Sequence, residues 1–230
     1  MEDHKKLRTL LISTKAVFLK DWRSELRTRY ALSALVMFVL TTIAIIVFAF
    51  GGESPSQEVL AGVLWVIIFF SGMSGLARTF VAEEERGTSL TLQLLTTPTA
   101  VLFGKLAFNV VLVLIVNTMA VLLFLFFFSS FRVDSVGLFV TTLTLGSIGL
   151  ASASTIIAAI IARANTKGSL FPVLSLPLLL PLLMTVIHAT TLSSEGAFFS
   201  EGLDDFRILV SYIGAVTGVS YILFDYVWKD

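Results

Sequence analysis

The sequence predicts an all-α integral membrane protein with six transmembrane helices, preceded by an amphipathic helix at the membrane surface. Of its 230 residues, 56% are hydrophobic and 14% are charged, and the mean hydropathy is +0.93. Soluble domains do not have this balance. The apolar residues gather in runs long enough to cross a bilayer. Cysteine does not occur in the sequence, so disulfides and thiolate metal sites are excluded.

The first thirty residues, 1–30, form a basic arm that we expect to be cytoplasmic. Its eight lysines and arginines alternate with apolar residues at helical spacing. This pattern predicts a helix on the membrane surface with its basic face toward membrane lipid, Trp22 at headgroup depth, and Arg23 and Arg27 beside it. A solvated charged leader is the alternative. We expect no cleavable signal, because the first apolar run begins only near Ala31.

Residues 31–230 are predicted to form the transmembrane domain. The expected spans are 31–50, 59–80, 101–128, 136–162, 169–189 and 206–224, and about 20 helical residues cross a hydrocarbon core. Asn109 and Asn117 in the third span are expected to form interhelical hydrogen bonds, with a translocation path as the alternative. Pro177 and Pro181 remove backbone donors inside the fifth span, so they are expected to kink or break it.

Basic residues are distributed unequally between the two sides of the membrane. Six spans place both termini on one side, and that side holds fourteen of the sixteen lysines and arginines, leaving Arg132 and Arg207 for the other. The positive-inside rule therefore places the termini, and the polar segment between spans two and three, in the cytoplasm. We expect a multi-pass protein of the bacterial inner (plasma) membrane.

The polar segment between the second and third spans is the candidate functional site. A short rigid segment between two spans can transmit the movement of a docked soluble domain into both helices. Leu90, Leu92 and Leu94 alternate as in a strand, whereas Leu90, Leu94 and Leu95 share one helix face; we favour the helix. A solvated loop is the alternative. The candidate coupling residues are Glu83, Glu84, Glu85, Arg86, Gly87, Thr88, Leu90, Leu94 and Leu95.

The sequence lacks the motifs of an enzyme. It contains no glycine loop ending in Lys-Ser or Lys-Thr, no HExxH and no GxSxG, so we expect no catalytic residues and no ATP site. It also lacks the paired intramembrane carboxylates of a proton or sodium carrier. His188, near the outer end of the fifth span, is a weak candidate for a haem-iron ligand. A lone histidine more often makes an ordinary polar contact, so no metal site is predicted.

The order of several motifs resembles the haem exporter B (CcmB) family. These motifs are the amphipathic amino-terminal helix, Glu-Arg-Gly-Thr at 85–88, Leu-Leu-Thr-Thr-Pro-Thr-Ala-Val-Leu-Phe-Gly-Lys at 94–105, and Leu-Pro-Leu-Leu-Leu-Pro at 176–181. The resemblance covers roughly residues 15–225. Related sequences often carry another acid three or four residues after the glycine, where this chain has Leu90 and Thr91.

The resemblance implies an ABC-2-like permease subunit of an ABC transporter complex, acting in haem export or haem-chaperone release during cytochrome c maturation. The implied partners are a cytosolic ATPase that binds ATP and magnesium, a second copy of the chain, a haem-binding C-type membrane subunit, a small membrane subunit and a periplasmic haem chaperone. Haem is then handled by the complex, no cofactor is bound by this chain, and no nucleic acid is expected. The family's coupling segment maps onto residues 83–98.

Two alternatives remain open at this point. One is an ABC-2-type exporter of another substrate, such as a lipid, a glycan or a drug. The other is a scaffold that conducts nothing and relays the movement of an ATPase to haem-binding partners.

Overall fold

The computed structural model describes residues 2–28, 30–52, 55–76, 78–85, 87–163 and 171–229, and the secondary-structure elements in these ranges are all helical. Six helices within them are long and apolar enough to cross a membrane. The predicted fold class, an all-α membrane protein with six spans, is confirmed.

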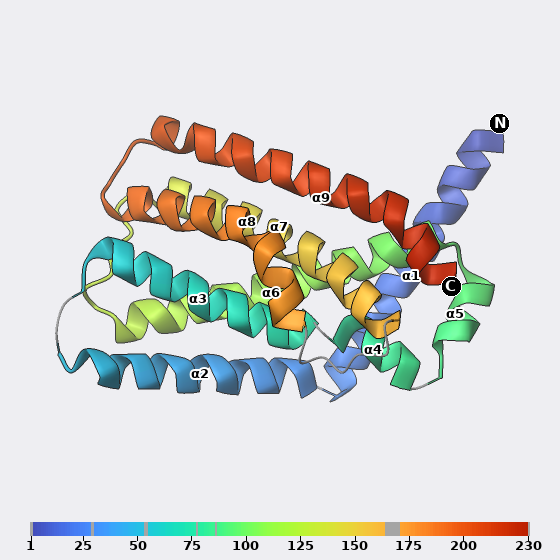
Figure 1. The fold of residues 1–230 in the computed structure, drawn as a ribbon, viewed down its shortest axis with the longest axis horizontal. Helices are drawn as coiled ribbons and strands as arrows, with labels where there is room; N and C mark the ends of the chain where they lie inside the picture. The colour runs from blue at the N-terminus through green and yellow to red at the C-terminus, as the bar shows by residue number, and fades with distance from the viewer. Residues whose placement is uncertain are drawn as a thin grey trace.

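The long helices run side by side along one axis (Figure 1), and both termini lie at the end of the bundle that carries α5. We call this end the α5 end. The elements are α1 (Glu2–Thr28), α2 (Tyr30–Phe50), α3 (Gln57–Leu76), α4 (Arg78–Glu85), α5 (Ser89–Leu95), α6 (Pro98–Phe127), α7 (Val136–Arg163), α8 (Phe171–Ser194), the 3-10 helix η2 (Phe199–Gly202) and α9 (Leu203–Lys229).

The last two spans are longer than the sequence indicates. The fifth was expected to end at Ala189, but α8 continues to Ser194. Its polar residues find partners without leaving the helix, since Ser194 Oγ donates to the Thr191 carbonyl at 2.7 Å and Thr190 Oγ1 accepts from Trp65 Nε1 at 2.8 Å. Hydropathy alone does not register such hydrogen bonds, within α8 or to a neighbouring helix, which satisfy the polar side chains at the end of the span.

The two prolines of the fifth span do not break it. Pro177 and Pro181 lie inside α8, which continues as one helix but bends part-way along its length in Figure 1, so the outcome is the expected kink and not a break. The Tyr212 hydroxyl of α9 donates to the Leu178 carbonyl, between the prolines, at 3.1 Å. A neighbouring helix thus supplies a donor where the proline rings disturb the backbone, which is how such sites are tolerated in lipid.

Helix α7 lies at the centre of the bundle. It packs against α3, α4, α6, α8 and α9. Of its most apolar stretch, 78% is buried inside the protein, compared with 17% for α2. Polar residues join it to α6: Asn117 Nδ2 donates to Ser147 Oγ at 2.9 Å, and Asn109 Nδ2 donates to Thr155 Oγ1 at 2.8 Å. Both asparagines of the third span therefore make interhelical hydrogen bonds, as favoured from the sequence.

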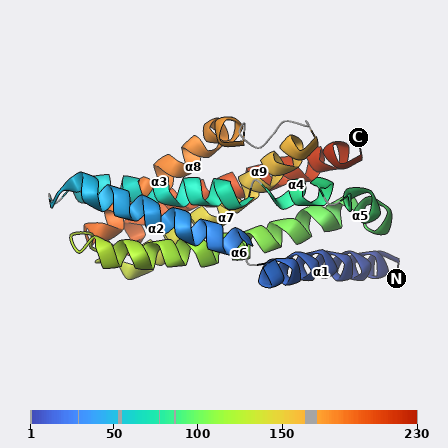
Figure 2. The same cartoon turned by 90° about the horizontal axis from the view of Figure 1, so that it is seen from below.

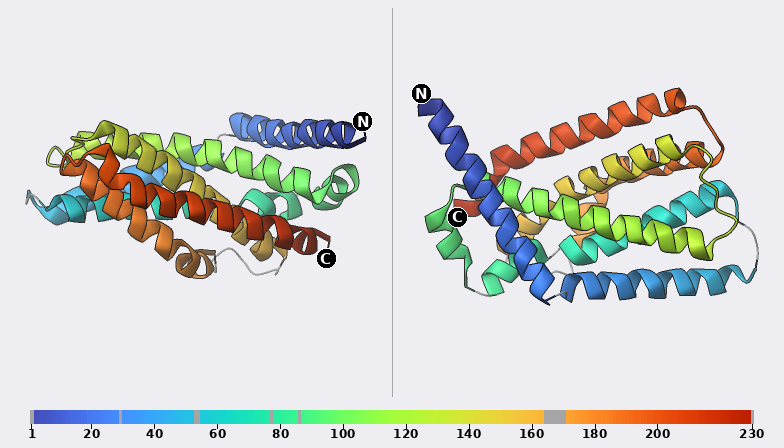
Figure 3. Two further views of the ribbon diagram at one scale, coloured as in Figure 1. Left: turned by 90° about the horizontal axis from the view of Figure 1, so that it is seen from above. Right: turned by 180° about the vertical axis from the view of Figure 1, so that it is seen from behind.

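Helix α1 lies outside this bundle and crosses α6 near the α5 end (Figures 2 and 3). The crossing depends on Gly104, because a Cβ atom there would lie 2.7 Å from Val17 Cβ and 2.9 Å from the Thr14 carbonyl oxygen. Further along α1, Phe18 and Trp22 stack with ring centroids 6.2 Å apart. Together with Leu32, they pack against a small buried cluster of Leu35, Phe108, Leu112 and Val116.

Candidate functional site

The predicted coupling segment forms a tight corner between α4 and α5. Helix α4 ends with the Thr88 amide donating to the Glu83 carbonyl at 3.0 Å, and Gly87 has a φ of +66°. This bond and a left-handed residue before it are the features of a Schellman C-cap, which favours glycine. The glycine of the motif therefore reverses the chain between two short helices.

The leucines after this corner lie on a helix. Helix α5 covers Ser89–Leu95, which confirms the helical alternative over the strand. It ends before Thr97, whose side chain accepts from the Ala100 amide at 3.4 Å and caps α6, with Pro98 in the first turn. Both ends of α5 are thus joined to longer helices by short, capped connections.

Helix α5 exposes an apolar face at one end of the molecule. Leu90, Leu94 and Leu95 are 69%, 87% and 76% exposed, whereas Leu92 packs against the main apolar core. On the inner side Gln93 Nε2 donates to the Trp228 carbonyl of α9 at 2.7 Å. These three large apolar side chains form an exposed face on a helix that is too short to cross a membrane.

The first acid of the cluster is buried. Glu83 is 9% exposed, and its carboxylate accepts from Lys20 of α1, from Lys105 of α6 at 3.3 Å, and from the Thr88 hydroxyl at 2.6 Å. Glu83 therefore joins α1, α4, α6 and the start of α5. The side chains of Glu84 and Glu85, and the whole of Arg86, fall outside the part of the chain that the structure describes.

Lys105 occupies the centre of this network. It is 1% exposed, and its ammonium donates to Asp21 of α1 at 3.2 Å, to the Thr79 carbonyl of α4 at 2.8 Å and to Glu83. The ammonium also lies 5.0 Å from the centroid of the Phe80 ring. A buried ammonium needs such partners, because removing a charge from water costs several kcal/mol.

The network changes the pKa values of Glu83 and Lys20. Burial alone raises the pKa of Glu83, but the charge of Lys105 and the hydrogen bonds from Lys20 and Thr88 outweigh it and hold the pKa at about 2, compared with an ordinary 4.5. Burial lowers the pKa of Lys20, but the charges of Asp21 and Glu83 reverse the effect and raise it above its usual value. Both groups are therefore charged at neutral pH.

Sequence reasoning identified the corner and its leucines but missed Lys20, Asp21, Thr79 and Lys105 as members of the site. One signal was available: Lys105 is a cation within the third apolar run, and an ionisable residue there needs a partner. Its partners lie 22 and 84 residues away in the sequence, and no local pattern identifies contacts of that range.

His188 lies at the other end of the bundle and has a carboxylate partner. Its Nδ1 lies 2.9 Å from Asp205 Oδ2 of α9, with the imidazole largely exposed and Asp205 buried. This is the ordinary polar contact between helices that a lone histidine more often makes. No group of three or more histidines, cysteines or acids that could hold a metal ion occurs among the described residues.

The assembled features agree with a comparison to protein families. The model of the CcmB protein family matches residues 12–226, which is nearly the whole chain and includes α5 and the crossing of α1 over α6. The chain belongs to the CcmB family. Comparison with curated proteins finds no match.

CcmB proteins are permease subunits of an ABC-type haem exporter in cytochrome c maturation, and they associate with the other components of that ABC complex. The family and the six apolar helices make this chain a multi-pass membrane protein. A permease subunit of this kind is not itself catalytic. This agrees with the sequence, which lacks nucleotide and hydrolase motifs.

Proposed function

We propose that the exposed leucine face of α5 is the docking surface for a cytosolic ABC ATPase, and that this chain couples ATP hydrolysis in that partner to haem export or haem-chaperone release. The observation that carries the proposal is the exposure of Leu90, Leu94 and Leu95 on a short helix that is fixed at both ends. The α5 end is then the cytoplasmic end, in agreement with the basic residues that gather there.

Movement of α5 has direct routes into the membrane domain. The capped corner joins α5 to α4 on one side, and the Thr97–Pro98 cap joins it to α6 on the other. Gln93 contacts α9, and the Glu83–Lys105 network adds α1. A rigid element with four such attachments transmits a displacement as a body, because packed helices deform little.

The wider assembly follows from the same proposal. The chain works as two copies with two ATPase subunits in the bacterial inner membrane, beside a haem-binding C-type subunit and a small membrane subunit, and a periplasmic haem chaperone leaves when ATP is hydrolysed. ATP and magnesium are bound by the ATPase, and haem is carried by the partners.

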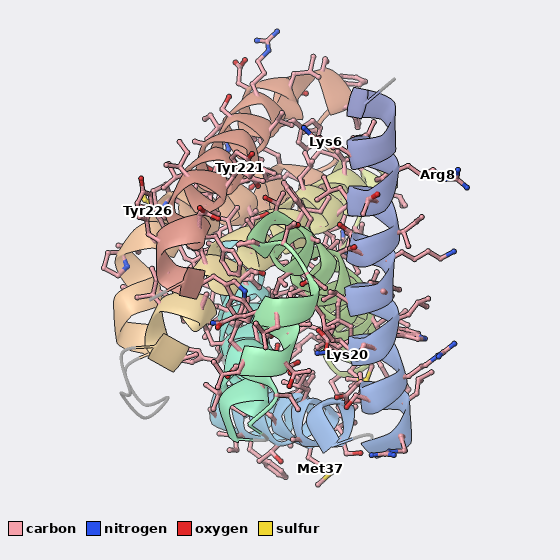
Figure 4. All side chains as sticks on the ribbon, turned by 90° about the vertical axis from the view of Figure 1, so that its right-hand side faces the viewer. Lys6, Arg8, Lys20, Met37, Tyr221 and Tyr226 are labelled. Atoms are coloured by element: carbon pink, nitrogen blue, oxygen red, sulfur yellow. The ribbon has the colours of Figure 1, made fainter. Side chains whose placement is uncertain are left out.

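The docking surface is tested by replacing Leu90 and Leu94 with aspartate and co-purifying the ATPase from membranes. Burying two leucines contributes about 2 kcal/mol each, so we expect the retained ATPase to fall at least tenfold while the amount of inserted protein stays unchanged. The control is Tyr226→Asp on α9, which is 70% exposed and also lies at the α5 end (Figure 4). Equal retention of the ATPase by wild type and double variant contradicts the docking assignment.

The alternatives differ from this proposal in what crosses the membrane. An exporter of a lipid, glycan or drug would carry that substrate through this subunit, whereas a scaffold would carry none. Reconstitution of this subunit with its ATPase alone, followed by measurement of haem flux, tests the scaffold, and the same reconstitution with a lipid, glycan or drug tests the other alternative. Haem flux without the other subunits contradicts the scaffold.

A further inference from the structure

A cavity of about 480 Å³, which both charged and apolar side chains line, is located at the α5 end between α1, α4 and α5. Its wall on α1 consists of Lys20, Asp21, Arg23, Ser24 and Arg27, and its opposite wall consists of Glu83, Thr88, Thr91, Leu92 and Leu95. The cavity borders the exposed leucine face, because Leu95 lines it whereas Leu90 and Leu94 do not. It is large enough for a small ligand.

The charges that line this cavity are not balanced. Both acids are already engaged, since Glu83 is bound to Lys20 and Lys105, and Asp21 is bound to Lys105 at 3.2 Å. Arg23 and Arg27 are exposed, lie one helical turn apart on α1, and make no ion pair with any described residue. Among the described residues, the cavity therefore presents two guanidinium groups for which no ion pair occurs.

The position of these arginines matches the depth of lipid headgroups. Helix α1 lies across the α5 end of the bundle (Figure 4), with Lys20 on the side of the bundle and Arg8 pointing away from it. Arg27 lies three residues before Tyr30, where α2 begins, and α2 contains the first apolar span. The Arg27 end of the cavity is thus at the membrane surface, where anionic lipids concentrate basic segments.

We propose that this cavity binds the phosphate-bearing headgroup of an anionic phospholipid of the adjacent leaflet. Arg23 and Arg27 supply planar donor groups that match phosphate oxygens, Thr91 lines the cavity opposite them, and Leu92 and Leu95 provide an apolar surface for the rest of the headgroup region. Because one wall is α1 and the other is α5, the lipid joins the surface helix to the helix proposed for docking. This inference does not depend on the ATPase assignment.

The test measures lipids retained by the purified full-length chain in native mass spectrometry, after exchange into detergent with equal amounts of phosphatidylglycerol and phosphatidylcholine. We expect wild type to retain phosphatidylglycerol preferentially, and Arg23→Gln/Arg27→Gln to lose about tenfold of that preference. The matched control is Arg8→Gln/Lys15→Gln, which removes two exposed charges of α1 that do not line the cavity and is expected to keep the preference.

A second variant tests the cavity without changing charge. Thr91→Trp fills the space between α5 and α1 and is expected to reduce the preference to the level of the arginine variant, so the test survives if the double variant does not fold. An equal loss in the Arg8/Lys15 control overturns the proposal in favour of general surface attraction, and so does a wild type without preference. Displacement of the lipid by millimolar inorganic phosphate overturns the lipid assignment in favour of free phosphate.

Discussion

Replacement of Glu83 by glutamine removes the carboxylate that joins α1, α4 and α6 while keeping the size of the side chain. Lys105, which is 1% exposed, then retains Asp21 and the Thr79 carbonyl but loses one of its two anions. The buried positive charge is no longer balanced within hydrogen-bond distance as it is in the wild type. The variant is therefore expected to be less stable, and α1 to be held less firmly.

The size of the expected loss of stability follows from the pKa of Glu83. Its pKa falls from 4.5 to about 2, which corresponds to roughly 3 kcal/mol at ~1.36 kcal/mol per unit. Removing one partner of a buried ion pair costs about 3–5 kcal/mol in other proteins. Since the Glu83 side chain is only 11% exposed, solvent screening reduces this figure little. For a chain of this length, ~3 kcal/mol lowers Tm by roughly 6–12 °C.

Thermal unfolding of the purified chain in detergent measures this loss, with Glu58→Gln, an exposed acid at the other end of the bundle, as the control. The double variant Glu83→Gln/Lys105→Met also removes the unbalanced ammonium, so its loss of stability is expected to be smaller than the sum of the two single losses. If Glu83→Gln unfolds at the wild-type temperature, the network does not hold α1 and the reasoning is refuted.

Two further predictions concern the attachment of α1. Gly104→Val is expected to displace α1, because the added atoms would overlap Val17 and the Thr14 carbonyl. Faster proteolysis between α1 and α2 would show this displacement, and Gly62→Val, at a position with open space around it, is the control. The stability that Glu83 contributes is present above pH ~4.5 and is lost as the pH falls toward 2, because the pKa of Glu83 is lower in the folded protein. The Tm of the wild type should therefore fall in this pH window, and the Tm of Glu83→Gln should fall less. Parallel curves of Tm against pH would contradict the depressed pKa of Glu83.

The six apolar spans could be predicted because each is a continuous run whose length matches a bilayer, and the described residues contain six helices long and apolar enough to cross one. Helix α5 was also predictable, since Leu90, Leu94 and Leu95 share a helical face. The end of α8 was not, because the hydroxyl hydrogen bonds that carry it to Ser194 depend on an established helix. The two prolines left both a kink and a break open, and packing against neighbouring helices maintains α8 as one helix.

Only the part of the candidate site that depends on the local sequence could be predicted. Leucines at helical spacing on a polar segment are visible in the local pattern, so the face that we propose for docking could be predicted from the sequence. The inward direction of Glu83 could not, because it is set by Lys105 on α6 and Lys20 on α1, which only the fold brings together. A run of acidic residues is expected to be solvated, and only the contact with the buried Lys105 shows that Glu83 is not.

Site-specific crosslinking tests the central claim, the docking of an ATPase on α5, most directly. The chain contains no cysteine, so a single cysteine at Leu94 or at Phe198 carries a photoreactive probe without background. Both positions are strongly exposed, at 87% and 78%, and they lie at opposite ends of the bundle. We predict that the Leu94 probe crosslinks to the ATPase in native membranes and the Phe198 probe does not. Crosslinking to the ATPase from Phe198, or from neither position, contradicts the account.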